Sequence, residues 1–217
     1  MFSHSEENYL KTIYHLSAKQ KPVSTNAIAE ALSTKPASVT DMIKKLNSKS
    51  VIHYQKYKGT TLTPEGEKEA LLIIRKHRLW EVFLLEKLNF NWDEVHEVAE
   101  QLEHIKSKRM IERLDQFLGF PKHDPHGDPI PDKNGELRDL EAIKLSTLAI
   151  NDEASVVAVK DENSSLLQYL DKVGIGIGSK IQVTDKIDFD ESLEIKIDGR
   201  DKKIISALVS ENILVQE

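Results

Sequence analysis

Apolar residues recur at intervals of three and four through the first half of the chain, whereas the C-terminal third alternates apolar and polar residues. The first spacing is typical of amphipathic helices, and the second is typical of half-buried strands. We therefore expect a mainly α protein with an all-β domain towards its C-terminal end.

Three short helices and a hairpin are predicted in the N-terminal part. Ser3 followed by Glu6 forms a capping box, Ser24 is a second helix cap, and Pro36 suits the first turn of a third helix. Two short β-like runs then flank Lys58-Gly59, as expected for a hairpin with glycine in its turn. This order predicts a winged helix-turn-helix, in which the third helix enters the major groove of DNA.

Three further helices are expected in the middle of the chain, at about residues 64–88, 93–107 and 108–118. Thr63, followed by a proline and an acidic residue, marks the start of the first of them. Their apolar positions exceed what one small layer of helices buries. We therefore predict that they form a dimer interface.

The C-terminal third holds the short β runs SVVAVK, SKIQVTDKI, LEIKID and KIISALV, with a helix SSLLQYLDKVG between the first two. The glycines of GIGIG lack the preceding strand and following helix that a dinucleotide-binding loop needs. We expect a small barrel of about five strands.

The segment FPKHDPHGDPIPDKNGE is rich in proline, glycine and aspartate and is expected to be a loop. It nevertheless holds His123, Asp124 and His126 close together. Two interpretations stay open: the loop folds back to supply a metal ligand, or it is a solvated turn.

Charge is distributed unevenly along the chain. Residues 1–63 hold nine lysines and four acidic residues, whereas the whole chain has a formal net charge of −6. A basic N-terminal part in an acidic protein favours contact with DNA there. Outward positions on and beside the third helix and two lysines of the hairpin are the candidates, the latter for phosphate contacts. These residues are Lys35, Ser38, Thr40, Asp41, Lys44, Lys45, Lys56 and Lys58.

Composition narrows the setting. No apolar run is long enough to cross a membrane, and the N-terminus lacks an apolar signal segment. We therefore expect a cytoplasmic protein with no membrane partner. The chain has no cysteine, which excludes disulfides and thiolate metal ligands.

Acidic and imidazole side chains gather along single helix faces in the middle of the chain. They are His96, Glu100, Glu103 and His104 at i, i+4, i+7 and i+8, and His77 and Glu81 at i, i+4 on the preceding helix. Nitrogen and oxygen donors without sulfur suit divalent manganese, iron or zinc. A solvated face is the simpler interpretation for any one of them, but six at this spacing without a lysine favour metal binding.

Several phrases together resemble the diphtheria-toxin-repressor family of iron- and manganese-dependent transcriptional regulators, in its long three-domain form. They are ENYLKTIYHL, SVTDMIKKL, LTPEGEKEA, RKHRLWEVFL, VHEVAEQLEHIKSKRM and FPKHDPHGDPIP. The resemblance implies a winged helix-turn-helix DNA-binding domain (1–63), a helical dimerisation and metal-binding domain (64–140) and an SH3-like, FeoA-like β-barrel (141–217). It also implies a homodimer that binds palindromic operator DNA when loaded with metal and represses metal-uptake genes.

The resemblance implies two metal sites in each subunit. The primary site would use Asn8, Glu100, Glu103 and His104. The ancillary site would use His77, Glu81 and His96, completed from the barrel by Glu162, with Ser165 as a second candidate there. Asp124 and His126 are further candidates, because this loop supplies ligands in some manganese-sensing members.

Departures from the family pattern bear on the choice of metal. Iron-sensing members carry methionine at the place of Asn8 and cysteine at the place of Glu100, so the two oxygen donors here favour Mn2+ as cofactor, with Fe2+ as the alternative. Short manganese-sensing members have aspartate at residue 8 and glutamate at the place of Lys11. A neutral amide weakens the primary site, and a charged lysine cannot bind a metal ion. A two-metal cluster built on residue 11 is therefore not expected.

Two other classes of function compete with this interpretation. A metallohydrolase would need an open coordination position and a general base in a substrate cleft. The sequence has no HExxH or nucleophile-elbow motif, so we expect neither enzymatic activity nor a small-molecule substrate. A winged-helix adaptor that binds protein, with purely structural histidines, is the other alternative. Manganese titration in the presence of promoter DNA separates it from a repressor.

Overall fold

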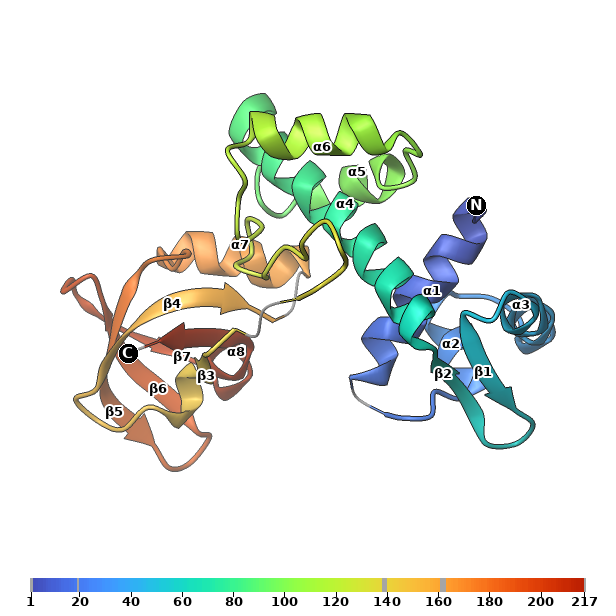
Figure 1. Ribbon diagram of the computed structural model, residues 1–217. Coiled ribbons are helices and arrows are strands. Elements are labelled where there is room, and N and C mark those ends of the chain that lie inside the picture. The colour runs from blue at the N-terminus through green and yellow to red at the C-terminus, as the bar shows by residue number, and fades with distance from the viewer. Residues whose placement is uncertain (1, 19, 138–139, 161–162, 217) are drawn as a thin grey trace. The chain divides into compact units, whose positions relative to one another are not determined.

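The computed structural model describes residues 2–18, 20–137, 140–160 and 163–216, which fall into two compact units (Figure 1). The first unit comprises residues 1–77, 100–111 and 130–138, and the second comprises residues 78–99, 112–129 and 139–217. The long helix α4 (Pro64–Leu88) is divided between them after His77.

The first unit opens with three helices and a two-stranded hairpin, as the sequence predicted (Figure 1). These elements are α1 (His4–Ser17), α2 (Thr25–Ala31), α3 (Pro36–Ser48), β1 (Ile52–Gln55) and β2 (Gly59–Leu62). The capping box is confirmed: the Ser3 hydroxyl accepts from the Glu6 backbone N–H, and the Glu6 carboxylate accepts from the Ser3 N–H. Ser24 caps α2 through its hydroxyl, which accepts from the Ala27 N–H. Lys35 precedes Pro36 at the start of α3 without a side-chain cap.

The core of the first unit joins the N-terminal helices to the first half of α4. Its fully buried side chains come from every helix of the group, and they include Leu10, Ile13, Ile28, Val39, Ile43, Leu46 and Ala70. Gly66 lets α4 approach the segment before β1, because a Cβ at this position would lie 1.8 Å from the Val51 carbonyl oxygen. The antiparallel register from Ile52↔Leu62 to Gln55↔Gly59 confirms the predicted wing.

Two short helices follow α4, and the first is shorter than the sequence predicted. Helix α5 spans Val95–Leu102, not 93–107, and α6 spans Lys108–Phe117. Glu103 and His104 therefore lie in a turn after α5, which the Ile105 N–H closes by donating to the Leu102 carbonyl at 3.2 Å. The physical reason is Ser107, whose hydroxyl accepts from the Met110 N–H at the start of α6. An N-cap needs an extended backbone, so the two helices cannot be continuous.

The second unit contains an antiparallel sheet of six strands in the order β3-β8-β4-β5-β6-β7. The strands are β3 (Ile143–Lys144), β4 (Glu153–Val159), β5 (Lys180–Ile187), β6 (Ser192–Ile197), β7 (Lys202–Ile205) and β8 (Ile213–Gln216). Helix α7 (Ser164–Val173) lies against the sheet and buries Leu167 and Leu170 in its core (Figure 1). The predicted C-terminal β domain is thus confirmed as an antiparallel sheet, with six strands where about five were expected and with α7 packed against it.

Two details of this sheet differ from the sequence prediction. The phrase KIISALV was expected to be one strand, but β7 ends at Ile205 and helix α8 (Ala207–Asn212) follows. The cause is Ser206, whose hydroxyl accepts from the Val209 N–H and so caps α8. The terminal strand β8 was not predicted, although it pairs with both β3 and β4.

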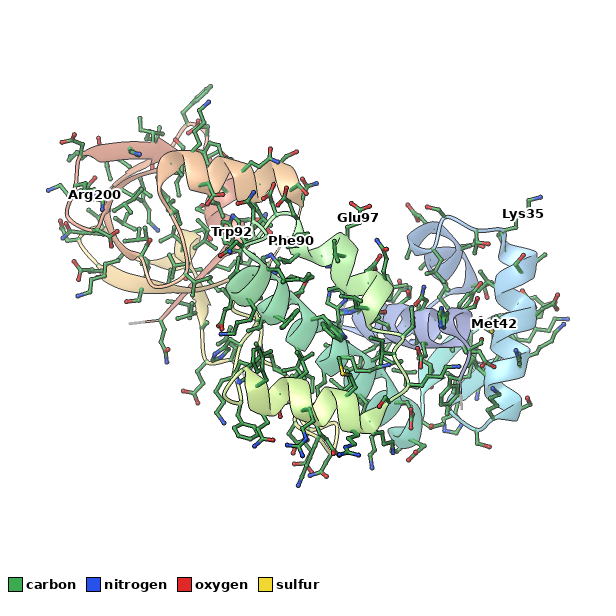
Figure 2. The ribbon with its side chains drawn as sticks, turned by 90° about the horizontal axis from the view of Figure 1, so that it is seen from above. Lys35, Met42, Phe90, Trp92, Glu97 and Arg200 are labelled. Atoms are coloured by element: carbon green, nitrogen blue, oxygen red, sulfur yellow. The ribbon has the colours of Figure 1, made fainter. Side chains whose placement is uncertain are left out.

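The loop between α4 and α5 is fixed to α7 within the second unit. Trp92 packs against the core of the sheet and donates from its indole nitrogen to the Asp171 carboxylate at 2.9 Å (Figure 2). Asp93 accepts from the Ser164 hydroxyl and the Gln168 amide at 3.1 and 2.7 Å. In the part of the chain that the structure describes, no helix combines the length and the apolar character needed to cross a bilayer.

Candidate metal centres

The turn after α5 and the first helix place acidic and imidazole side chains together in the first unit. His104 Nδ1 lies 2.5 Å from a carboxylate oxygen of Glu7, and its Nε2 lies 3.8 Å from Glu103 Oε1. Lys11 Nζ lies 2.8 Å from Glu103 Oε2 and 3.3 Å from Glu100 Oε1. Side chains of α1 therefore meet the acidic residues at the end of α5, although about 90 residues separate them in the sequence.

Glu103 is the most buried acid of this group, with a side chain that is 1% exposed. Its Oε2 also lies 2.6 Å from Nδ1 of His77, one of the last residues of α4 within the first unit. Burial opposes ionisation of Glu103, but the hydrogen bond from His77 and the charge of Lys11 outweigh it and hold the pKa of Glu103 below its usual value. The carboxylate is therefore ionised and oriented without a metal ion.

Asn8 lies between Glu7 and Lys11 on α1. Its side-chain oxygen Oδ1 is buried and has no hydrogen-bond partner among the residues that the structure describes. A buried polar atom without a partner costs free energy, on the order of 1–3 kcal/mol. An amide oxygen in this state is a ready acceptor for a cation, so the donor chemistry of this group fits a metal ion that prefers oxygen and nitrogen.

A second group of donors lies in the second unit. One ligand atom from each of Glu81, Asp124 and His126 lies within 4.8 Å of the others, and all three residues are buried. His96 Nδ1 lies 3.5 Å from Glu81 Oε1, and the His96 side chain is 43% exposed. His126 Nε2 is within hydrogen-bonding distance of the Trp92 carbonyl oxygen, at 2.8 Å. His126 Nδ1 is buried and has no hydrogen-bond partner among the residues that the structure describes.

The loop that carries Asp124 and His126 folds back against the sheet. Asp124 Oδ1 accepts from the backbone N–H groups of His126 and Asp128, which closes a tight turn. The Val159 N–H of β4 donates to the His126 carbonyl at 2.9 Å. Gly127 has φ +91°, and a Cβ there would lie 1.9 Å from the Val157 carbonyl oxygen. The interpretation of this loop as a solvated turn is therefore wrong for these residues, whereas His123 is exposed.

The other predicted ligands are placed as follows. Glu100 is on α5 with its side chain 54% exposed, and its Oε1 lies 3.3 Å from Lys11 Nζ. Ser165 is exposed near the start of α7, where its N–H donates to Asn163. Glu162 lies outside the residues that the structure describes. His77 is one helical turn before Glu81 on α4.

Three residues at these centres, Glu7, Lys11 and Arg78, were not predicted as members. Glu7 contacts His104 and has Lys76 Nζ at 3.7 Å. Arg78 donates to Asp128 at 2.6 Å and lies 3.3 Å from Asp124 Oδ2. The spacing of Glu7 and Lys11 at i, i+4 was a usable signal, but nothing in the sequence pairs Arg78 with a loop 50 residues away.

The candidate DNA-binding residues lie on or beside α3 and the hairpin. All but Thr40 are exposed, and Figure 2 shows Lys35 at the start of α3. Lys44 pairs with Asp41 at 3.3 Å, and Lys45 lies 3.3 Å from the buried carboxylate of Glu6. Thr40 donates to the Pro36 carbonyl. Lys56 lies over the ring of Tyr57 at the tip of the wing, 4.9 Å from its centroid.

Three family descriptions match successive parts of the chain. "Iron dependent repressor, N-terminal DNA binding domain" matches residues 1–60, and "Iron dependent repressor, metal binding and dimerisation domain" matches residues 63–132. "FeoA domain" matches residues 143–217. Together these three matches account for most of the sequence.

Individual relatives agree with these matches. A regulator named MntR from Oceanobacillus iheyensis is 32% identical over 69% of this chain and 96% of its own length. An uncharacterised helix-turn-helix-type transcriptional regulator of Methanocaldococcus jannaschii is 38% identical over 54% of this chain and 94% of its own. A solved manganese-dependent transcriptional repressor in complex with manganese has a TM-score of 0.84 and 33% identity, covering 97% of this chain and 98% of that one.

Proposed function

We propose that Mn2+ controls this chain, which belongs to the iron-dependent repressor family of metal-dependent transcriptional repressors. Binding of Mn2+ at the two candidate centres would promote binding of the winged helix to palindromic operator DNA. The genes under control would be those of metal uptake. The observation that carries the proposal is the contact between α1 of the DNA-binding region and the acidic residues around the end of α5.

The primary centre would be held by Asn8, Glu100, Glu103 and His104. The unpartnered Oδ1 of Asn8 and the buried carboxylate of Glu103 support this assignment. A divalent cation bound there would supply positive charge to neutralise the acids and coordination to join side chains from two elements.

The ancillary centre would be held by Glu81, His96, Asp124 and His126, with His77 and Glu162 as further ligands. Support comes from the buried Nδ1 of His126, which has no described partner, and from the proximity of the ligand atoms of Glu81, Asp124 and His126. Because the loop of His126 is hydrogen-bonded to β4, a metal ion at this centre would stabilise the attachment of the sheet to that loop.

Manganese is the preferred metal because both centres offer oxygen and nitrogen donors and no sulfur. The relative solved with manganese supports this choice. Ferrous iron is the second candidate, since a relative from Mycobacterium leprae that is 32% identical is named as an iron-dependent repressor. Oxygen-rich sites do not exclude Fe2+, and metal availability contributes to selectivity.

Control of DNA binding would act through α1. Glu7, Asn8 and Lys11 lie on one helix whose Leu10 and Ile13 are fully buried in the core that also holds α3. A change in how α1 is held against residues 100–104 would therefore alter the position of the recognition helix. Coupling between metal and DNA of about 1–3 kcal/mol is usual for such devices, and operator DNA would tighten metal binding by the same factor.

Operator recognition would divide between α3 and the wing. Ser38, Thr40, Asp41 and Lys44 would face base edges, with Lys35 and Lys45 beside them, while Lys56 and Lys58 would contact phosphates. Only metal-loaded protein would present two such helices at the half-site spacing of a palindrome, about one helical turn of DNA or a multiple of it.

A homodimer is required for that recognition. The exposed apolar side chains Leu88, Phe117 and Phe120, at the end of α4 and on and after α6, support a helical dimer interface within residues 64–140.

We propose three functional domains: residues 1–63 for DNA binding, 64–140 for dimerisation and metal binding, and 141–217 as the sheet domain. On this proposal the metal ions regulate, and no enzymatic reaction takes place.

Metal binding by Glu103 is the direct test. We expect calorimetric titration of the metal-free protein with Mn2+ to lose its primary-site phase in Glu103→Gln. Glu97→Gln is the matched control, because Glu97 is exposed on α5, the helix just before the turn that holds Glu103, and the substitution should leave the titration unchanged (Figure 2). A Glu103→Gln protein that remains folded and binds Mn2+ like the wild type would contradict the assignment.

A further inference from the structure

Lys11 lies inside the candidate primary centre. Its ammonium group is 2.8 Å from Glu103 and 3.3 Å from Glu100, and no more than 13% of the lysine side chain is exposed. Lysines are rarely this buried unless they are paired. The position of Lys11 is therefore set by the two carboxylates that a metal ion would use.

The backbone of α1 makes this position possible. Lys11 follows Glu7 by four residues and Asn8 by three, so the three side chains lie along one face of the helix. Its neighbours Leu10 and Ile13 are fully buried and fix the helix in place. The ammonium group thus reaches the acidic residues from the same face that offers the unpartnered oxygen of Asn8.

The charge balance of the centre depends on this lysine. The Glu103 carboxylate is buried, and it lies close to the ammonium group of Lys11 and to the imidazoles of His77 and His104. An ionised carboxylate with a 1% exposed side chain needs a counter-charge, because desolvation otherwise penalises it heavily. Lys11, whose ammonium group lies 2.8 Å from Glu103 Oε2, is placed to supply that counter-charge.

A divalent cation and an ammonium group compete for the lone pairs of the same two carboxylates. The two cations also repel each other, and this repulsion is strong at short distance in a poorly solvated site. Metal binding to Glu100 and Glu103 therefore weakens or breaks the ion pairs of Lys11, and that loss is subtracted from the metal's binding free energy.

We propose that Lys11 is an intramolecular counter-ion that holds the carboxylates of Glu100 and Glu103 in the metal-free protein and sets the metal affinity of the primary centre by competition. This inference rests on the proposed function. Lys11 keeps α1 attached to residues 100–104 in the absence of metal, and it raises the metal concentration at which the primary centre fills.

The test compares wild-type, Lys11→Met and Glu103→Gln full-length proteins by Mn2+ calorimetry and by thermal unfolding of the metal-free form. We expect Lys11→Met to bind Mn2+ at the Glu103-dependent phase roughly tenfold more tightly, or better, since one tenfold step needs only about 1.4 kcal/mol. The metal-free protein should unfold at a lower temperature, and Mn2+ should raise that temperature by more than in the wild type.

Two further variants complete the design. Lys49→Met is the matched control, because Lys49 pairs at 2.6 Å with a different buried glutamate of α1, Glu6, outside the candidate centre. Its Mn2+ affinity should equal that of the wild type. Lys11→Gln should shift affinity in the same direction as Lys11→Met, and it serves if the methionine variant does not fold.

The possible failures are distinguishable. If Glu103→Gln abolishes a binding phase but Lys11→Met and Lys11→Gln bind Mn2+ no more tightly than the wild type, the counter-ion proposal is overturned and the metal site stands. If Glu103→Gln binds Mn2+ like the wild type, the primary centre itself is wrong, and the role of Lys11 falls with it.

Discussion

Glu6 is a buried acid at the start of α1 with two lysine partners. Its carboxylate lies 2.6 Å from Lys49 Nζ and 3.3 Å from Lys45 Nζ, and it accepts from the Ser3 backbone N–H. Burial opposes ionisation, but the hydrogen bonds from Lys49, Ser3 and Lys45 outweigh it and lower the pKa of Glu6 to about 2. The same contacts attach α1 to α3 and its C-terminal end.

The lowered pKa predicts acid sensitivity that depends on Glu6. Because the unfolded chain binds a proton near the usual pKa of 4.5 and the folded chain only near 2, this stabilisation is complete above about pH 4.5 and is lost as the pH falls towards 2. We expect Glu6→Gln to reduce the free energy of unfolding by about 2 kcal/mol at pH 6 and by less at pH 3. Denaturant unfolding of the metal-free protein at both pH values measures this.

Glu30→Gln is the control for that experiment, because Glu30 is exposed on α2. Its free energy of unfolding should follow the wild type at both pH values. An equal loss at pH 3 and pH 6 in Glu6→Gln would contradict the assigned role of the ionised carboxylate.

At the scale of residues, the sequence predicted helix caps and candidate metal-ligating side chains better than the residues that these side chains contact in the fold. Ser3, Ser24 and the histidine and acid positions follow from local spacing, which a single sequence contains. The contact of Lys11 with Glu103 spans 92 residues and depends on how α1 meets the end of α5. Helical periodicity assigns a side chain to a face of its own helix and says nothing about the element opposite.

At the scale of elements, the loop of Asp124 and His126 depends on one glycine. Gly127 combines a positive φ with a close approach to the backbone of β4. A side chain at this position meets the Val157 carbonyl oxygen and adopts a strained backbone conformation. The loop must then move away from the sheet, and His126 must move with it.

Gly127→Ala is therefore expected to lower the free energy of unfolding by about 2–4 kcal/mol and to weaken Mn2+ binding at the ancillary centre. Gly178→Ala is the matched control: its φ of +86° is similar, but no heavy atom lies within 4 Å of the added Cβ. Gly178→Ala should lower the free energy of unfolding by a smaller amount, because only backbone strain contributes, and it should bind Mn2+ normally. Denaturant unfolding and calorimetry provide both measurements, and equal effects of the two substitutions would refute the close-contact explanation.

Helix and strand ends were the elements that sequence patterns predicted least well. The helix at α5 was expected to continue to about residue 107. The strand at β7 was expected to continue through the first residues of what is helix α8. In both cases a serine, Ser107 or Ser206, caps a new helix inside an apolar pattern that is continuous across the boundary. The apolar pattern is judged over a window of many residues, so it does not detect a boundary that one serine hydroxyl creates by hydrogen-bonding to the backbone.

At the scale of the whole molecule, the chain combines a basic DNA-reading part with acidic parts that hold the candidate metal ligands. The N-terminal 63 residues carry an excess of lysine over acid, and the complete chain has a net charge of −6. The carboxylates gathered at the candidate centres favour a cation that neutralises them. Metal-dependent DNA binding is the consequence that we propose.

Operator binding at controlled free metal tests this account most directly. The probe is a labelled duplex selected from a random-sequence library with the full-length protein and Mn2+, and affinity is measured by fluorescence anisotropy with buffered Mn2+ or with chelator. The account predicts binding about 5- to 150-fold tighter with Mn2+, which corresponds to a coupling of about 1–3 kcal/mol, and no such gain in Glu103→Gln. Equal affinity for the duplex in chelator and in Mn2+ would contradict it.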